Sequence, residues 1–161
     1  MVYPGQPQDL QMKIAAIGMG SPVTASSCWA PDHGVDRCRL NFSTNYGSNS
    51  WCAKVNDANQ WLQVNFGGEV RTVTEIHMQG RHAHPQWVKQ YQLKYTNDGI
   101  NWEIYCGGEV FEACHDENTI VPQKLPMPIQ CRAIRICPTS WHGHISIRCE
   151  VFYLMAPVYT H

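Results

Sequence analysis

Several features that would point to other classes of protein are missing from this 161-residue sequence. The formal net charge is −1 and basic residues form no long runs, so there is no electrostatic footprint for nucleic acid or anionic lipid. No apolar stretch approaches the roughly 20 residues that a membrane-spanning helix needs. The segment from Met1 to Pro7 lacks the basic and apolar parts of a secretory signal peptide. We therefore expect no nucleic acid among the partners.

Motifs of catalysis are absent as well. The sequence holds no Gly-x-Ser-x-Gly turn, no His-Glu-x-x-His pair and no glycine-rich loop that would bind phosphate. Hydrolysis of a glycoside needs two opposed carboxylates. The polar loops considered below hold only Asp32 and Asp36, which lie on the same loop. We expect a binding protein and not an enzyme.

The eight cysteines permit two interpretations. An even number in a loop-rich chain is typical of a disulfide framework, and short-range pairs such as Cys28 with Cys38 or Cys106 with Cys114 would close loops. Cys149, in contrast, has the strand parity of the apolar residues around it, which favours a free thiol in the core. No Cys-x-x-Cys pair is present, which argues against a zinc knuckle or a thioredoxin-type site.

What the sequence does contain is a regular series of short alternating segments. Leu62, Val64 and Phe66 alternate with polar or aromatic neighbours, and Asn97-Asp98-Gly99 is a strong tight-turn signal. No segment of ten or more residues has a helical period. The pattern predicts an all-β protein, an antiparallel β-sandwich or jelly roll. Strands are expected over residues 61–66, 73–78, 91–95, 102–106, 119–121, 133–136 and 145–153, with a proline-rich connection over 122–128.

The N-terminal third of the chain is less regular. Residues 10–17 could form a first strand or a helical turn, and residues 18–59 are polar and weakly periodic. Because this is long for a loop in a compact domain, we expect it to be pinned by contacts or to be functional. We place an N-terminal lead-in at 1–17, one domain at 18–155 and a tail at 156–161.

The order of motifs resembles the discoidin domain family, also called the coagulation-factor type C domain, over residues 18–153. Within the family, Asp32-His33-Gly34-Val35 and the segment from His144 to Glu150 resemble the discoidin lectins more than the clotting factors. The cell-attachment tripeptide Arg-Gly-Asp of some discoidin lectins is replaced here by Arg81-His82-Ala83. The motifs that carry the resemblance include Thr24-Ala25-Ser26-Ser27, Arg39-Leu40-Asn41, Trp51-Cys52, Trp61-Leu62-Gln63-Val64, Gln79-Gly80-Arg81, Trp87-Val88, Tyr95 to Gly99 and Arg135 to Pro138.

The resemblance implies an eight-stranded jelly roll with its ligand site on loops at one end. In this chain the loops would be residues 27–36, 81–86 and 139–144. It also implies a carbohydrate-binding lectin of the galactose or N-acetylgalactosamine type that acts in cell recognition or adhesion. Because single lectin sites bind weakly, we expect multivalency through a homo-oligomer or a partner domain.

Binding a sugar needs polar groups that reach vicinal hydroxyls and an apolar face that packs on the ring. Arginine is the best bidentate donor, and an aspartate accepts two hydroxyl protons. Alternatives stay open: Arg81 could instead form a buried ion pair, Trp87 and Trp141 could anchor the core, and His144 could face solvent. The candidate ligand-binding residues are Trp29, Asp32, His33, Arg81, His82, His84, Trp141, His142 and His144.

A metal at the site is a further alternative. His82 and His84 share their spacing with His142 and His144, and four converging imidazoles would suit zinc, nickel or copper. No carboxylate stands at a fixed spacing from them. Calcium would need carboxylate or carbonyl oxygens, which the segment from Asn41 to Asn49 could supply. The sequence does not establish a cofactor, and calcium stays an open alternative.

The competing function is that of an extracellular protein- or phospholipid-binding adhesion module without sugar specificity. Insertion into a membrane needs exposed apolar loop tips, but the loop at 81–86 is polar and only Trp29 could insert. We therefore do not expect insertion. In either case we expect the protein outside the cell or at its surface, reached by non-classical export or as the mature part of a longer chain.

Overall fold

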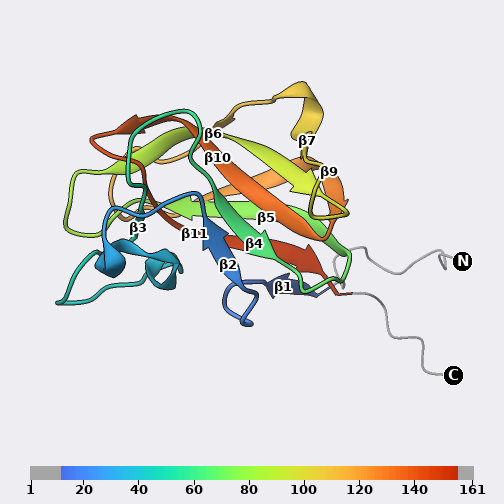
Figure 1. Cartoon of the computed structure of the whole chain (residues 1–161), viewed down its shortest axis with the longest axis horizontal. Coiled ribbons are helices and arrows are strands. Elements are labelled where there is room, and N and C mark those ends of the chain that lie inside the picture. The colour runs from blue at the N-terminus through green and yellow to red at the C-terminus, as the bar shows by residue number, and fades with distance from the viewer. Residues whose placement is uncertain (1–11, 156–161) are drawn as a thin grey trace, which may run out of the picture.

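The computed structural model describes residues 12–155, which form two antiparallel sheets packed face to face (Figure 1). This confirms the predicted all-β sandwich. One sheet has five strands in the order β1-β11-β5-β9, with β3 also paired to β11; the other has six in the order β2-β4-β10-β6-β7, with β8 also paired to β6. The strands of the first sheet are β1 (Lys13–Ala15), β3 (Trp51–Cys52), β5 (Arg71–Gln79), β9 (Val121–Cys131) and β11 (Ser146–Leu154). Those of the second sheet are β2 (Val23–Ala25), β4 (Leu62–Asn65), β6 (Trp87–Thr96), β7 (Glu103–Ile104), β8 (Phe111–Glu112) and β10 (Ala133–His142).

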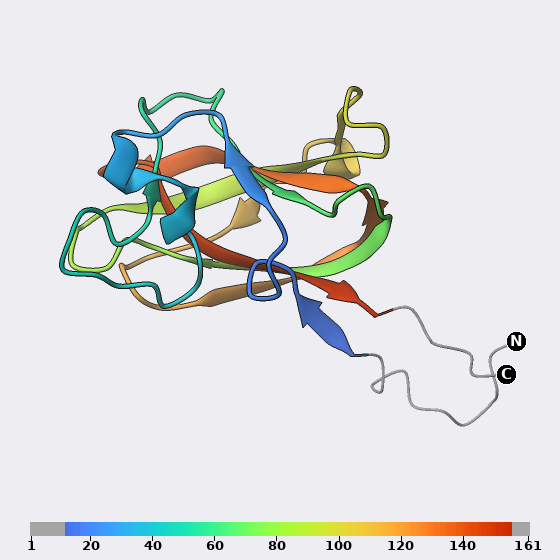
Figure 2. The same cartoon turned by 60° about the horizontal axis from the view of Figure 1, so that its bottom comes forward.

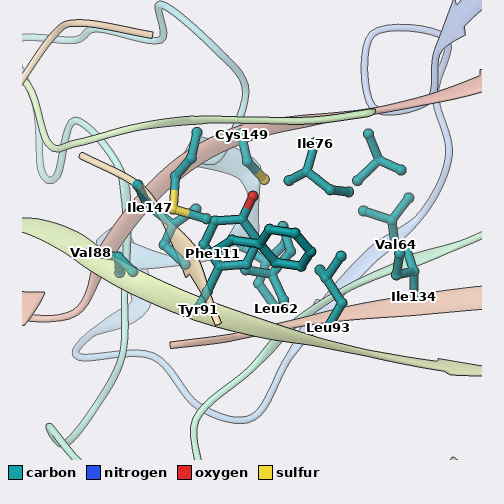
Figure 3. Close-up of a cluster of buried hydrophobic side chains, with 14 of the residues drawn as sticks. Leu62, Val64, Ile76, Val88, Tyr91, Leu93, Phe111, Ile134, Ile147 and Cys149 are labelled. Carbon is teal, nitrogen blue, oxygen red and sulfur yellow. The ribbon is translucent and has the colours of Figure 1, made fainter. Parts of the chain in front are cut away.

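The core lies between the two sheets, as the alternating segments predicted. Leu62 and Val64 of β4 are fully buried, and the side chains of Ile76 and Ile147 come from the opposite sheet (Figure 3). Cys149 is also fully buried in this layer, which confirms that it is a small core residue. Burying one such aliphatic side chain contributes roughly 1.5–3 kcal/mol relative to leaving it exposed.

Contacts with the strands pin the polar segment 18–59. The indole Nε1 of Trp51, a fully buried residue, donates to the carbonyl of Ser27 at 2.9 Å. The hydroxyls of Ser26 and Ser27 both donate to the Gln60 Oε1, at 2.8 and 2.6 Å. The segment also contains the short 3-10 helices η2 (Pro31–His33) and η3 (Val35–Arg37), which Figure 2 shows at one end of the sandwich. It is therefore an ordered part of the domain.

Several predicted boundaries are wrong, among them that of the return strand expected over 102–106, which covers only Glu103–Ile104. The proline-rich segment 122–128 lies within strand β9, which is at the edge of its sheet, where a residue without an N–H is tolerated. Lys124 pairs with Glu75 and Ile129 pairs with Val73, so β9 has more residues than β5 between these two pairs. The prolines at 126 and 128 therefore occupy a bulge. In addition, β10 continues to His142, so most of the expected loop 139–144 is strand.

The N-terminal lead-in is only partly described. Its residues 13–15 form β1 and pair with β11, so they belong to the sandwich. Residues 1–11 of the lead-in and the tail at 156–161 lie outside the described residues. Another 3-10 helix, η4 (Tyr105–Gly107), lies at the end of the sandwich opposite η2 and η3 (Figure 2).

All eight cysteines are free thiols in the structure. The two suggested short-range disulfides, Cys28 with Cys38 and Cys106 with Cys114, are therefore wrong. Within each pair one cysteine is buried and the other is exposed. The fold is consequently held by its core and its hydrogen bonds rather than by disulfides.

Candidate binding site

The three predicted loops meet at one end of the sandwich and enclose a pocket, which we call the first pocket. Its volume is about 290 Å³, near the lower end of the range for small-molecule sites, which suits a single sugar ring. Loop 27–36, loop 81–86 and the turn at 143–144 each contribute side chains, although they are far apart in the sequence. The first pocket is lined by Trp29, His33, Cys52, Arg81, Gln86 and His144.

His33 is oriented by the neighbouring carboxylate of Asp32. The His33 Nδ1 and the Asp32 Oδ1 are 2.7 Å apart, and this hydrogen bond, the largest cause, lowers the pKa of Asp32 below its usual value. A carboxylate can only accept, so the Nδ1 of His33 carries the proton. When the imidazole is neutral, its Nε2 is unprotonated and can accept a hydroxyl proton from a ligand in the pocket. Asp32 acts through His33 and does not line the first pocket itself.

Arg81 is held by a hydrogen bond and not by the buried ion pair that the sequence left open. Its Nη1 donates to the Gln86 Oε1 at 2.9 Å, and the Ser146 hydroxyl donates to the same oxygen at 3.1 Å. Among residues 12–155, Arg81 makes no ion pair. With the Gln86 oxygen occupied on both sides, the Nη2 of Arg81 and the Nε2 of Gln86 can donate to a ligand, and the buried Nε of Arg81 also has no partner among residues 12–155.

His144 faces the protein rather than solvent, so the solvent-facing alternative is wrong. Its Nε2 lies 2.6 Å from the carbonyl oxygen of Ala53, and its Nδ1 lies 3.1 Å from the Asn56 Nδ2. Because both nitrogens are engaged, His144 offers the pocket a ring and no hydrogen bond. The ring packs edge-on against Trp29, with centroids 5.6 Å apart and an interplanar angle of 84°.

Trp29 gives the first pocket its apolar surface. The side chain is 60% exposed, as its place in a polar loop predicted. Its backbone N–H donates to the carbonyl of Cys52 at 2.9 Å, which ties loop 27–36 to β3. An indole held in this way can pack against the C–H face of a sugar ring, while the polar groups of Arg81, Gln86 and His33 reach its hydroxyls.

Sequence reasoning did not identify the base of the first pocket. Cys52 lies there with its thiol 3.3–3.4 Å from the hydroxyls of Ser48, Ser50 and Ser146. Gln86 was also missed as a ligand-binding candidate, although it ends the predicted loop 81–86. Its position between Arg81 and Ser146 depends on folding and has no signal in the sequence.

The other candidates lie outside the first pocket. The imidazole of His142 stacks on the indole of Trp87, with centroids 4.2 Å apart and planes 12° from parallel. The His82 Nδ1 bonds to the Asn118 Oδ1 at 3.2 Å, and His84 is exposed. Trp141 and Trp87 are half-buried and pack against the core, as the anchoring alternative proposed.

The alternative of a metal site built from four converging imidazoles is therefore not supported. Within the part of the chain that the structure describes, no group of three or more His, Cys, Asp or Glu side chains is placed to hold a metal ion. In the segment proposed for calcium, the carbonyls of Tyr46 and Ser48 accept hydrogen bonds from Arg37, at 2.7 and 3.0 Å. A guanidinium therefore already occupies two of the oxygens that this segment could offer to a calcium ion. A cofactor is not established either way.

A membrane-spanning helix is not found either: none of the helices in residues 12–155 has the length and apolar character to cross a bilayer.

Comparison with known proteins places this fold in a family. A family model described as the F5/8 type C domain matches residues 22–151. Discoidin-2 of Dictyostelium discoideum is 39% identical over 142 residues, covering 84% of this chain and 55% of that protein. Retinoschisin of Mus musculus is 34% identical over 128 residues, covering 76% of this chain and 56% of that protein. The chain thus spans about half the length of these curated relatives.

Solved structures give the same result. Native recombinant discoidin II of Dictyostelium discoideum matches with a TM-score of 0.87 at 35% identity, covering 92% of this chain and 62% of that one. A family 32 CBM from C. perfringens NanJ, solved in complex with galactose, matches with a TM-score of 0.63 at 19% identity, covering 88% of this chain and 99% of that one. At that identity the second match shows a shared fold alone.

Proposed function

Because the chain belongs to the F5/8 type C, or discoidin, domain family, we propose that it is a carbohydrate-binding lectin of the galactose or N-acetylgalactosamine type. Membership of this family agrees with the prediction of a binding domain that is not an enzyme. The proposal extends to a role in cell recognition or adhesion, with the protein acting outside the cell or at its surface.

The observation that carries this proposal is the set of groups in the first pocket. Donors from Arg81 and Gln86 and an acceptor from His33 surround the space beside the exposed ring of Trp29. A galactoside has neighbouring hydroxyls, which need both donors and acceptors, and an apolar patch of C–H groups, which needs an aromatic face. The pocket supplies each of these from a different loop.

The proposed sugar is held without a covalent step. The Nη2 of Arg81 and the Nε2 of Gln86 donate to hydroxyl oxygens, the Nε2 of His33 accepts one hydroxyl proton, and Trp29 covers the ring. Each net hydrogen bond contributes about 0.5–1.5 kcal/mol, and more where the donor is charged. A site with so few contacts binds weakly, and a homo-oligomer or a partner domain would supply avidity.

A second candidate function is binding of a protein or a phospholipid surface. It is supported by the exposure of Tyr46, at 83%, on the same end of the domain as Trp29. The carbonyl of Tyr46 is bound by Arg37, and the N–H of Ser48 donates to the carbonyl of Asp32 at 2.9 Å, so this segment lies beside loop 27–36. Phosphatidylserine-dependent co-sedimentation with vesicles would favour this candidate.

A glycan-array screen with and without a chelator tests the proposal. Selective binding to glycans with terminal galactose or N-acetylgalactosamine would support a lectin, and loss of that signal with chelator would add a metal to the site. An array without signal, using correctly folded protein, would contradict the proposed lectin function and favour the second candidate, a protein or lipid ligand.

A further inference from the structure

A second hollow is lined by the same loop, 81–86, that lines the first pocket, and we call it the second pocket. Its volume is about 400 Å³, and it is lined by Pro85, Trp87, Asp116, Glu117 and Asn118. Pro85 lines the second pocket and its chain neighbour Gln86 lines the first. Consecutive Cα atoms are about 3.8 Å apart, so a single loop separates the two pockets.

The wall formed by residues 116–118 is built into the fold. Arg148, which is only 2% exposed, donates from its Nη2 to the carbonyl of Glu117 at 3.0 Å and to the Asn118 Oδ1 at 2.8 Å. Gly80 lets this wall approach closely, because a Cβ at that position would lie 2.7 Å from the carbonyl of Asp116. The wall is thus fixed from behind by a buried cation and a glycine.

The loop between the pockets is fixed as well. A Cβ on Gly143 would lie 2.6 Å from the carbonyl of Pro85, so the turn after β10 packs directly against this loop. On its other side, the Arg81 N–H donates to the carbonyl of Gln86 at 3.0 Å and closes the loop. The two pockets therefore keep a constant relation to one another.

The second pocket offers polar groups beside an aromatic surface. The carboxylate of Asp116 accepts a hydrogen bond from the Thr119 hydroxyl at 2.6 Å and is thus engaged within its own segment. This bond, the largest cause, lowers the pKa of Asp116. In residues 12–155 the carboxylate of Glu117 takes part in no hydrogen bond or ion pair. Because the Asn118 oxygen is bound by Arg148, its amide nitrogen is left as a donor. Trp87 is half-buried and stacked on His142.

We propose that the second pocket is a subsite for the next sugar of an oligosaccharide whose terminal sugar occupies the first pocket. The Glu117 carboxylate would accept hydroxyl or amine protons of that second sugar, the Asn118 amide would donate to it, and Trp87 would pack against its ring. This inference rests on the proposed function, because it needs a sugar in the first pocket.

The charge of the second pocket sets the class of sugar that it takes. Asp116 and Glu117 line it, the Glu117 carboxylate takes part in no hydrogen bond or ion pair among residues 12–155, and none of the lining residues is basic. Like charges disfavour an anionic group here. The second sugar is therefore neutral or carries a free amine, and sialic acid or a uronic acid at this position is excluded.

Calorimetric titration of the purified chain tests this inference. The ligands are N-acetylgalactosamine, a neutral trisaccharide ending in that sugar, and the same trisaccharide with a sialic acid on its second residue. We expect the wild type to bind the neutral trisaccharide about 3–10-fold more tightly than the monosaccharide, since one or two extra hydrogen bonds are gained. We expect the sialylated ligand to lose that gain.

The variant Glu117→Ala should reduce the advantage of the trisaccharide to about 2-fold or less, with monosaccharide affinity unchanged. Glu117→Lys should restore binding of the sialylated ligand relative to the neutral one. Glu109→Ala removes an exposed carboxylate away from both pockets and should change nothing.

Equal affinity of the wild type for the monosaccharide and the neutral trisaccharide would overturn the subsite while leaving the lectin intact. An equal loss for both ligands in Glu117→Ala would also overturn it. Absence of binding to every sugar would refute the proposed function itself, and the subsite with it.

Discussion

The Nε2 of His144 lies 2.6 Å from the carbonyl oxygen of Ala53, a contact that requires this nitrogen to carry a proton. At the opposite side of the ring, Asn56 faces the Nδ1 with its amide nitrogen at 3.1 Å, since its oxygen accepts from the N–H of Ile145 at 2.9 Å. A donor therefore points at the Nδ1, which must be unprotonated. The geometry fixes His144 as a neutral imidazole with one tautomer.

Acidification should therefore weaken sugar binding. A proton on the Nδ1 of His144 would oppose the Asn56 amide and loosen the ring behind Trp29, and a proton on the Nε2 of His33 would remove an acceptor. Both effects favour binding at high pH, and both are lost as pH falls.

The variant Asn56→Asp separates the two histidines. An aspartate would accept from a protonated His144 Nδ1, so the decline with pH should become shallower and keep only the contribution of His33. Titration calorimetry at several pH values measures this. If wild-type affinity did not change on acidification, neither histidine would belong to the binding site.

Removing the charge of Asp32 should affect binding and leave stability unchanged. Asp32→Asn keeps the size of the side chain but weakens the bond that orients His33, so we expect an affinity loss of about 3–10-fold. The Asp32 side chain is 54% exposed, and the midpoint of urea unfolding should therefore stay the same. Asp36→Asn, on the same loop, is the matched control. Unchanged affinity in Asp32→Asn would remove His33 from the contacts.

Arg148 should be among the most sensitive residues for stability. It is buried and donates to four oxygens: the carbonyls of Phe42, Gly80 and Glu117 and the side chain of Asn118. Burial, the largest cause, lowers the pKa of Arg148, but a guanidinium still stays charged at neutral pH. Arg148→Met would leave these acceptors unsatisfied, and we expect a loss of about 3 kcal/mol or more in urea unfolding. A loss below about 1 kcal/mol would contradict this role.

A methyl group at position 80 should disturb the packing of the wall, residues 116–118, against strand β5 and its end at Gly80. The added Cβ of Gly80→Ala would meet backbone oxygens of Asp116 and Glu117 at 2.7 and 3.0 Å. Overpacking of this kind costs about 1–3 kcal/mol. Gly18→Ala is the control, because the nearest atoms there are 3.5 Å or more away. Equal unfolding midpoints for the two variants would contradict this prediction, because residues 116 and 117 would then move aside without a cost in stability.

Thiol titration checks the absence of disulfides. Cys28 and Cys106 are exposed, so they should react with a thiol reagent in the native protein. In denaturant, without any reductant, all eight cysteines should react. Fewer reactive thiols in denaturant would mean that disulfides form, contrary to the structure.

Much of the fold could be predicted because strand alternation is local. The pattern of Leu62 and Val64 gave both the strand and its buried face. The edge strand β9 could not be predicted in the same way, because its prolines are typical of turns, and only the position of β9 at the sheet edge makes them acceptable. The end of β10 was missed because its register shifts near Ser140.

The site could be predicted in outline and not in detail. The resemblance placed the three loops at one end, and Trp29, His33, Arg81 and His144 do line one pocket. Histidine spacing could not show which imidazoles face it. The partner of His82 is Asn118, which lies 36 residues away in the sequence.

The central claim is that the first pocket binds a terminal galactose-type sugar through Arg81. Calorimetric titration with N-acetylgalactosamine tests it most directly in the wild type, in Arg81→Ala and in Arg132→Ala. Arg132 is an exposed arginine that bonds to the carbonyl of Gly68 at 2.7 Å, away from the site, and serves as control. We predict binding by the wild type and Arg132→Ala, with affinity reduced at least 10-fold in Arg81→Ala, since a charged hydrogen bond contributes about 1.5–3 kcal/mol. Equal affinity in all three proteins, or no binding by the folded wild type, would contradict the account.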